Sequence, residues 1–557
     1  MKSYKNIRNC SLLVLAIFMS NSCTKDFKEL NTPQNLITEE LVTPDLLLTA
    51  VEINAGNGLG FGNDGDFCGM RTADDNAPFV DYFDNGGWNT TYTVLGNNLA
   101  AIIRKTENDP ELVNKKSIAR ILKAWIFSQA TDIYGDIPYF ESNKLPEEAD
   151  PNPKYDTQKS IYEDLLKELK EAAAGLDAGK PGFGNADLIY QGDLTKWKKF
   201  ANSLRLRLAL RVRYADPEMA KSNMSDLTES GLILTSDDDA LFFTSSDVTA
   251  HQNGAYNNFL NFVSGPESKE LIAKTILDIL SNGDAHNPID PRIRIYADTA
   301  TAKFPPKLNP PLPYFGYRGQ PLLGNVRVQE KYPYGYESTS RWADFWYVPV
   351  IEEPILRGSE MYFALAEAVL FKLRTGDAND YFKKGIQAAV TETQNFYNRT
   401  KGQLAKVESL LRPNWTSADI NAMLSHKEMK PAEIAAFLAS PVTTLKGSDD
   451  EMLEQIMNQK MVALAPNSME GWTEWRRTGY PRVLVAADET STLHGVSYRR
   501  GHYPSVEGLI NSENVKEAIL RLPGGKDDVL ARVWWDANLT APHKHPGTVE
   551  NRPAAWQ

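Results

Sequence analysis

The sequence predicts a mainly α-helical protein that contains a helix pair of the tetratricopeptide kind and a loop-rich stretch with few short strands. In residues 117–142, apolar side chains recur every three or four positions until Gly135, which is typical of a largely buried helix. Residues 157–174 and 193–213 read as two amphipathic helices joined by a loop, as in a tetratricopeptide hairpin. From about 235 to 350 this pattern gives way to prolines and aromatics, which predicts loops and short strands.

Caps and apolar spacing predict the remaining helices. Thr43 as the N-cap residue and Pro44 at the first helical position start a helix over 44–55. In the helix that begins at Asp193, the side chains of Arg205, Arg207, Arg211 and Arg213 lie off a narrow apolar stripe. Helices resume at 352, and the segment 356–373 is apolar nearly all round, which predicts a central helix. Further helices are expected over 91–107, 267–280, 378–397, two short ones within 417–438, and 449–465.

The N-terminus has the pattern of an export signal. Lys2, Lys5 and Arg8 precede the short apolar stretch 11–19, which is too short to span a bilayer. Small residues then precede Cys23, as in a bacterial lipobox, and a polar stretch follows like a tether. We therefore expect a signal peptide over 1–22, lipidation of Cys23 by fatty acyl chains such as palmitate, and a tether over 23–40. The alternative is an ordinary secretory signal with a chance cysteine.

Charge and cysteine content narrow the possible partners. The net charge of −12 and the lack of a dense Lys/Arg run argue against nucleic acid and against attraction to anionic membrane surfaces. If the signal is removed and Cys23 is lipidated, Cys68 is the one cysteine left, so the mature chain forms no internal disulfide.

Four separated segments together resemble one bacterial family. They are AWIFSQATDIYGDIPYFES (124–142), EPILRGSEMYFALAEA (353–368), EGWTEWRRTGYPRV (470–483) and YRRGHYPSVEGLINSENVKEAI (498–519). With the Cys23 signal and the closing VWWDAN (533–538), they resemble the SusD/RagB-like nutrient-binding outer-membrane lipoproteins of Bacteroidetes. The resemblance implies a SusD-like fold, in which tetratricopeptide-type helix pairs form a scaffold with an irregular loop-rich half and few short strands. It also implies a role in passing a captured glycan or peptide to a SusC-like TonB-dependent β-barrel transporter. In these motifs Trp472, Trp475 and the adjacent arginines are expected to be structural.

The resemblance gives a division of the chain after the tether. A single body covers 41–557, with helical pairs over about 88–215 and 352–480 and a C-terminal segment over 481–557. The loop-rich ligand half covers about 56–87 and 235–350.

Two loop regions, 64–92 and 314–346, combine aromatic rings with planar polar groups, which is the mixture a saccharide site needs. The alternative for any single aromatic is that it plugs its loop onto the core. The candidate ligand-binding residues are Asp66, Arg71, Trp88, Asn89, Tyr92, Tyr314, Tyr317, Tyr336 and Trp342.

Catalytic, cofactor and metal sites find little support. Glu360 and Glu367 lie two turns apart on a buried helix, and we expect them to pair with Arg or Lys instead of acting as a glycosidase pair. No H-E-x-x-H, G-x-S-x-G or P-loop motif occurs, so no cofactor is expected. Asp64 and Asp66 lack EF-hand spacing, Asp237–Asp239 read as a solvated loop or a helix cap, and His543 with His545 reads as a solvated turn.

The residues and the resemblance together favour a non-catalytic, lipid-anchored protein on the surface of the outer membrane, which binds an oligosaccharide and delivers it to a transporter. Three alternatives stay open at this stage. The cargo could be a peptide, the protein could only seal or organise the barrel, or it could be a secreted polysaccharide hydrolase.

Overall fold

The computed structural model describes most of the chain. The described residues are 42–56, 68–72, 85–145, 148–245, 252–256, 271–284, 287–300, 316–319, 340–411, 413–483 and 498–543. The predicted signal peptide, Cys23 and the tether lie outside them. No helix in the described part of the chain is both long and apolar enough to cross a lipid bilayer.

The described residues are mainly helical, as the sequence predicts. The N-terminal helices are α3 (Pro44–Gly56), α5 (Asn85–Asn89), the π-helix η1 (Thr90–Gly96), α6 (Asn97–Thr106), α7 (Val113–Tyr134), α8 (Gln158–Gly175), α9 (Leu194–Arg211) and α10 (Pro217–Met224). The later helices are α12 (Lys274–Ser281), α13 (Ile293–Tyr296), α14 (Gly358–Leu370), α15 (Ala378–Leu411), α16 (Ser417–Lys427), α17 (Pro431–Leu438), α18 (Asp449–Leu464), α19 (Ser468–Thr478), α20 (Ser505–Ile510) and α21 (Ser512–Arg521). Short 3₁₀ turns connect several of them, including η2 (Pro110–Leu112), η3 (Gly184–Ala186), η4 (Val212–Tyr214), η5 (Glu229–Gly231), η8 (Asp344–Trp346), η9 (Pro441–Thr443) and η10 (Pro523–Gly525).

Local caps set several helix ends where the sequence places them. The Thr43 hydroxyl accepts a hydrogen bond from the Leu46 amide at the start of α3, and Thr157 and Asp193 cap α8 and α9. Gly135 ends α7 with φ of 86°, a conformation that a residue with a Cβ atom rarely adopts. These ends follow from the side chains beside them, which is why they can be read without knowing the fold.

The strands form two short antiparallel pairs among the described residues. β1 (Arg71–Thr72) pairs with β3 (Leu271–Ile272), and β2 (Ala240–Phe243) pairs with β4 (Glu352–Leu356). Both pairs correct helix predictions. Helix α12 begins at Lys274, after β3, although the apolar spacing predicts a helix from 267, and residues 352–356 form β4 ahead of α14. A strand this short is stabilised by its distant partner, which local periodicity does not reveal.

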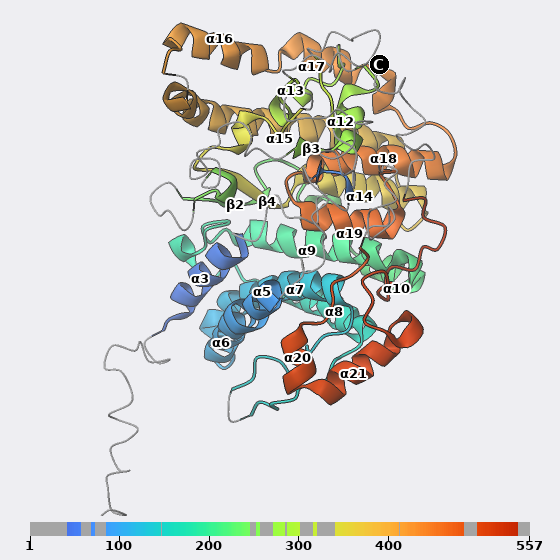
Figure 1. Ribbon diagram of the computed structural model, residues 1–557. Coiled ribbons are helices and arrows are strands. Elements are labelled where there is room, and N and C mark those ends of the chain that lie inside the picture. Colours follow the sequence, from blue (N-terminus) through green and yellow to red (C-terminus); the bar gives the residue numbers. More distant parts are fainter. Residues whose placement is uncertain are drawn as a thin grey trace, which may run out of the picture.

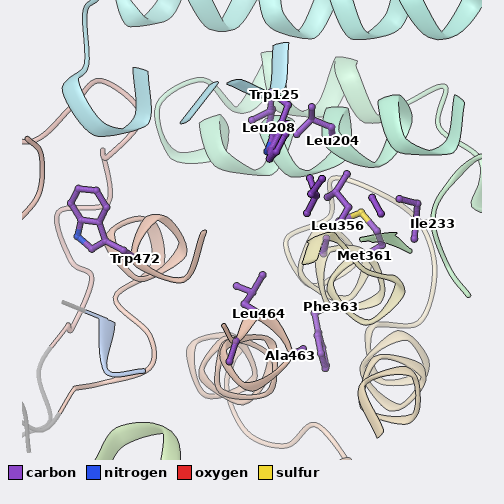
Figure 2. Close-up of a cluster of buried hydrophobic side chains, with 14 of the residues drawn as sticks. Trp125, Leu204, Leu208, Ile233, Leu356, Met361, Phe363, Ala463, Leu464 and Trp472 are labelled. Carbon is purple, nitrogen blue, oxygen red and sulfur yellow. The ribbon is translucent and has the colours of Figure 1, made fainter. Parts of the chain in front are cut away.

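The helices pack in layers around α9 (Figure 1). Figure 1 shows α7 and α8 on one side of α9, and α14, α15 and α18 on the other. Helices α7, α8 and α14 contact α9 directly, α7 packs on α8, and α15 and α18 pack on α14. The predicted partner of α14, over 378–397, is the N-terminal part of the longer α15. In Figure 2, Leu204 and Leu208 of α9 and Trp125 of α7 lie across from Leu356 and Met361. This apolar contact joins the N-terminal helices to the C-terminal ones in one core.

Buried ion pairs run through the same core. The cations are Arg207 and Arg211 of α9, Arg213 of the adjoining turn η4, Lys460 of α18 and Arg477 of α19. They bind carboxylates from α7, α14 and α19. The carboxylates are those of Asp132, Glu360, Glu367, Glu470 and Glu474. The arginines that lie off the apolar stripe of α9 are therefore buried, because α9 has protein on both sides. Five cations meet five carboxylates, so the charges balance where water does not reach them.

Candidate functional site

The predicted ligand-binding residues divide into three sets. Asp66, Tyr314 and Tyr336 lie outside the described residues. In the first cluster, Arg71 lies on β1, and Tyr317 and Trp342 lie on non-helical segments that a backbone hydrogen bond from Ser340 to Arg318 joins. In the second cluster, Trp88 and Asn89 of α5 and Tyr92 of η1 lie on one continuous helix. Figure 1 shows α5 beside α6 and α7, well away from β3, which lies near α12 and α14.

The first cluster joins both predicted loop regions through β3. Arg71 of β1 lies opposite Ile272 of β3, and Leu271 bridges to Arg341, next to Trp342. The Trp342 side chain is fully buried, with its ring 5.5 Å from that of Trp346 and 5.9 Å from that of Tyr296. Arg71 is also buried, and Tyr317 is half-buried. Trp342 therefore contributes its ring to the core, as the plugging alternative describes.

The second cluster surrounds Trp88. Its ring lies 4.8 Å from that of Tyr92 and 5.0 Å from that of Tyr134, and the side chain is 4% exposed. The Tyr92 hydroxyl donates a 2.8 Å hydrogen bond to the Pro138 carbonyl. Burial raises the pKa of Tyr92 well above its usual value, so the phenol stays protonated as this bond requires. Asn89, one residue after Trp88, is exposed.

An exposed strip of polar side chains runs along the wide turn η1. Asn89, Thr93 and Asn97 are four residues apart and all exposed. Phe140 lies in the turn that follows Pro138 and is 49% exposed. Both the Tyr139 and Phe140 amides donate 2.9 Å hydrogen bonds to Asp156, which holds this turn in place. We call Asn89, Thr93, Asn97 and Phe140 the η1 face.

The η1 face has the chemistry of a saccharide-binding surface. Amide and hydroxyl groups can both donate to and accept from sugar hydroxyls, and an exposed aromatic ring can pack against the C–H face of a sugar. The residues around Trp88 identify this region in the sequence, but Phe140 does not stand out there. It lies two residues after an Ile-Pro pair that marks only an extended segment. The turn that carries it is joined to η1 by the hydrogen bond from Tyr92 to Pro138, which spans 46 residues of the chain.

Glu360 and Glu367, the two carboxylates considered as a glycosidase pair, both form ion pairs with arginines. Glu360 binds Arg207 at 2.5 Å, and Glu367 binds Arg213 at 2.7 Å and also Arg477. The prediction that they pair with arginine is thus confirmed. Among the described residues, no group of three or more His, Cys, Asp and Glu side chains is placed to hold a metal ion.

The structure tests two predictions about polar loop residues. Asp237 is exposed, whereas Asp238 and Asp239 are buried, and Asp239 accepts a 2.8 Å hydrogen bond from the Gly358 amide. The helix-cap alternative is therefore confirmed for Asp239, which caps the distant helix α14. His543 is half-buried, with its ring 4.7 Å from that of Trp475, where a solvated turn was expected. His545 lies outside the described residues. In both cases a partner from another part of the chain covers the loop.

Comparisons with known proteins agree with the fold. Residues 71–504 match a SusD-like family that is described as "Starch-binding associating with outer membrane". A solved structure of a chitin-binding protein is 27% identical, with a TM-score of 0.71 over 89% of this chain and 100% of that chain. A chitin-binding SusD homolog from Flavobacterium johnsoniae is 23% identical, with a TM-score of 0.61 over 90% of this chain and 96% of that chain.

A SusD homolog from Bacteroides fragilis is 22% identical, with a TM-score of 0.68 over 89% of this chain and all of that chain. No curated protein matches this chain. The resemblance carried by the four sequence segments is confirmed, because the match spans most of the chain and the helical architecture is shared. This chain belongs to the SusD-like family.

Proposed function

We propose that this protein is a non-catalytic lipoprotein of the outer-membrane surface that binds an oligosaccharide and passes it to a SusC-like TonB-dependent transporter. The observation that carries the proposal is the family match over residues 71–504, since that family is described as starch-binding and associated with the outer membrane. The lipid anchor at Cys23, placed by the sequence just after an export signal, would hold the body at the membrane.

Chitin oligosaccharides are the ligand class to test first. The chitin-binding protein that is 27% identical aligns with 89% of this chain, which supports a shared cargo class. The N-acetyl groups of chitin offer amide donors and acceptors, and the amides of Asn89 and Asn97 on the η1 face can pair with both. We propose that the η1 face contributes to the ligand site, together with the candidate residues Asp66, Tyr314 and Tyr336.

Binding is expected to need no chemistry from the protein. Glu360 and Glu367 are buried in ion pairs with arginines, so neither carboxylate is free to act as a general acid or a nucleophile. Incubating the protein with chitin oligosaccharides should return them uncut, and chromatography of the sugars would detect any hydrolysis. Cleavage at enzymatic rates would favour the hydrolase alternative.

The test of binding uses calorimetry with chitin oligosaccharides, other glycans and peptides. Phe140→Ala should weaken oligosaccharide binding about three- to tenfold, because an aromatic contact contributes roughly 0.5–1.5 kcal/mol. Phe243→Ala is the matched control, since Phe243 is 46% exposed on β2, away from η1, and its loss should leave binding unchanged. If the protein bound peptides but not glycans, the proposed cargo would change from an oligosaccharide to a peptide. If it bound neither, the proposal would be refuted.

A further inference from the structure

The helix that carries the η1 face contains an unusually wide turn. The chain runs from α5 into η1 and on into α6 with helical backbone angles at both junctions, Asn89 (φ −59°, ψ −45°) and Asn97 (φ −63°, ψ −44°). A π-helical turn is rare, holds one residue more than an α-helical turn, and is frequently found at functional sites. One residue corresponds to about 100° of rotation about the helix axis. The width of this turn therefore decides which side chains before it face solvent.

The side chain of Asn143 is inserted at this turn. Its amide nitrogen donates one hydrogen bond to the Tyr92 carbonyl and another to the Asn97 side-chain oxygen, both of 2.7 Å. The backbone N–H of Asn97 donates its hydrogen bond to the Val94 carbonyl. The Asn143 amide thus satisfies a carbonyl inside the wide turn and reaches one of the side chains of the η1 face.

The backbone of Asn143 is held so that its side chain points this way. Asn143 has φ of 58°, the left-handed conformation that asparagine tolerates better than most residues. Its carbonyl accepts a 3.0 Å hydrogen bond from Arg104 of α6. The hydrogen bond from Tyr92 to Pro138 joins the same turn to η1 at its other end.

Gly96 makes room for the inserted amide. A Cβ atom at this position would lie 2.4 Å from the Asn143 side-chain oxygen and 2.9 Å from its Cγ atom, closer than real Cβ atoms come. Gly96 is buried and helical, so its missing side chain serves this close approach and not a special backbone conformation. Because the Asn143 amide is anchored by two hydrogen bonds, it cannot move aside without breaking them.

We propose that Asn143 and Gly96 form a lock that holds the wide turn of η1 open, and that Asn143 is a positioning residue for the glycan-binding η1 face. This inference rests on the proposed function for its binding consequence, but the lock itself does not. If the turn narrowed by one residue, the part of the helix before it would rotate against α6. Trp88 would then leave its aromatic cluster, or Asn89 would lose its exposure.

The first test changes the chemistry of the inserted group at constant size. Asn143→Asp keeps the shape and the tolerance for the left-handed conformation but places a second acceptor against the Tyr92 carbonyl. We expect faster hydrogen–deuterium exchange of the backbone amides over residues 89–98 and chitin-oligosaccharide binding weakened about tenfold. Asn223→Ala is the control, because Asn223 makes a 2.9 Å hydrogen bond to a carbonyl of the same kind, that of Met219 on α10. It should change neither quantity.

A second test asks whether the two residues act as one unit. Gly96→Ala should speed the same exchange and weaken binding in the presence of Asn143. In an Asn143→Gly background, which removes the colliding side chain, Gly96→Ala should have little further effect. Additive effects of the two substitutions, or wild-type exchange over 89–98 in Asn143→Asp, would overturn the lock. Altered exchange with unaltered sugar binding would keep the lock and overturn its positioning role, and no binding by the wild type would instead refute the proposed function.

Discussion

Arg477→Met tests how much the buried ion pairs contribute to the stability of the core. The Arg477 side chain is fully buried and binds Glu367, at 2.7 Å from one of its nitrogens, and Glu474 at 2.6 Å. Burial alone would raise the pKa of Glu367, but Arg477 and Arg213 together hold it below its usual value. Methionine keeps much of the volume and removes the charge.

The expected cost follows from what remains after the substitution. Glu367 keeps Arg213 at 2.7 Å, and Glu474 keeps Lys460 at 3.0 Å, so each carboxylate retains one cation. Removing one partner of a buried ion pair costs roughly 3–5 kcal/mol of folding stability. Because both carboxylates retain a cation, we expect Arg477→Met to lie near the lower end, at about 3 kcal/mol. With an unfolding entropy of about 2.1 cal/mol/K per residue, that corresponds to a melting temperature lower by roughly 3 °C.

The assay is calorimetric melting together with urea unfolding of the purified protein. Arg120→Met is the matched control, because Arg120 also binds two carboxylates, Glu168 and Glu171, but on the surface, where the loss should be below about 1 kcal/mol. Glu367→Gln combined with Arg477→Met removes one charge of each sign and should cost less than the sum of the single changes. The reasoning would be refuted if Arg477→Met lowered the free energy of unfolding no more than Arg120→Met does. It would also be refuted if the effects of Glu367→Gln and Arg477→Met were strictly additive.

Three further predictions address pH, the core and the anchor. Burial and the neighbouring Arg499 lower the pKa of His543 to about 4. The free energy of unfolding should therefore fall by up to about 3 kcal/mol as the pH drops from about 6.5, the usual histidine pKa, to about 4. His543→Gln should make the urea midpoint less dependent on pH over this range, and an unchanged dependence would contradict the prediction. Trp342→Ala should destabilise the protein by about 3–5 kcal/mol in urea unfolding, because its ring is part of the core. If the variant instead kept full stability and lost ligand binding, Trp342 would belong to the ligand-binding site. Cys23→Ser should move the protein from the membrane fraction to the soluble fraction, and continued firm attachment would contradict the lipid anchor.

The candidate site was only partly readable from the sequence. Asn89 and Tyr92 stand beside a tryptophan in a region rich in polar and aromatic residues, and the structure places Asn89 on an exposed face. Asn143 and Phe140 carry no such signal, because the hydrogen bonds that join their segment to η1, from Asn143 to Tyr92 and from Tyr92 to Pro138, span about 50 residues of the chain. Composition identifies which chemistry is present in a segment, but not which turn lies against it.

The sequence by itself determined the helical class and many helix ends, because apolar spacing and capping groups such as Thr157, Asp193 and Gly135 act within one turn of the chain. It also determined the family, since the ordered motifs can be compared directly with relatives. Only the tertiary structure decided that Arg207 and Arg211 are buried, because their carboxylate partners come from α7, α14 and α19. The same holds for the short strands and the wide turn of η1, whose stability depends on groups that only folding brings together.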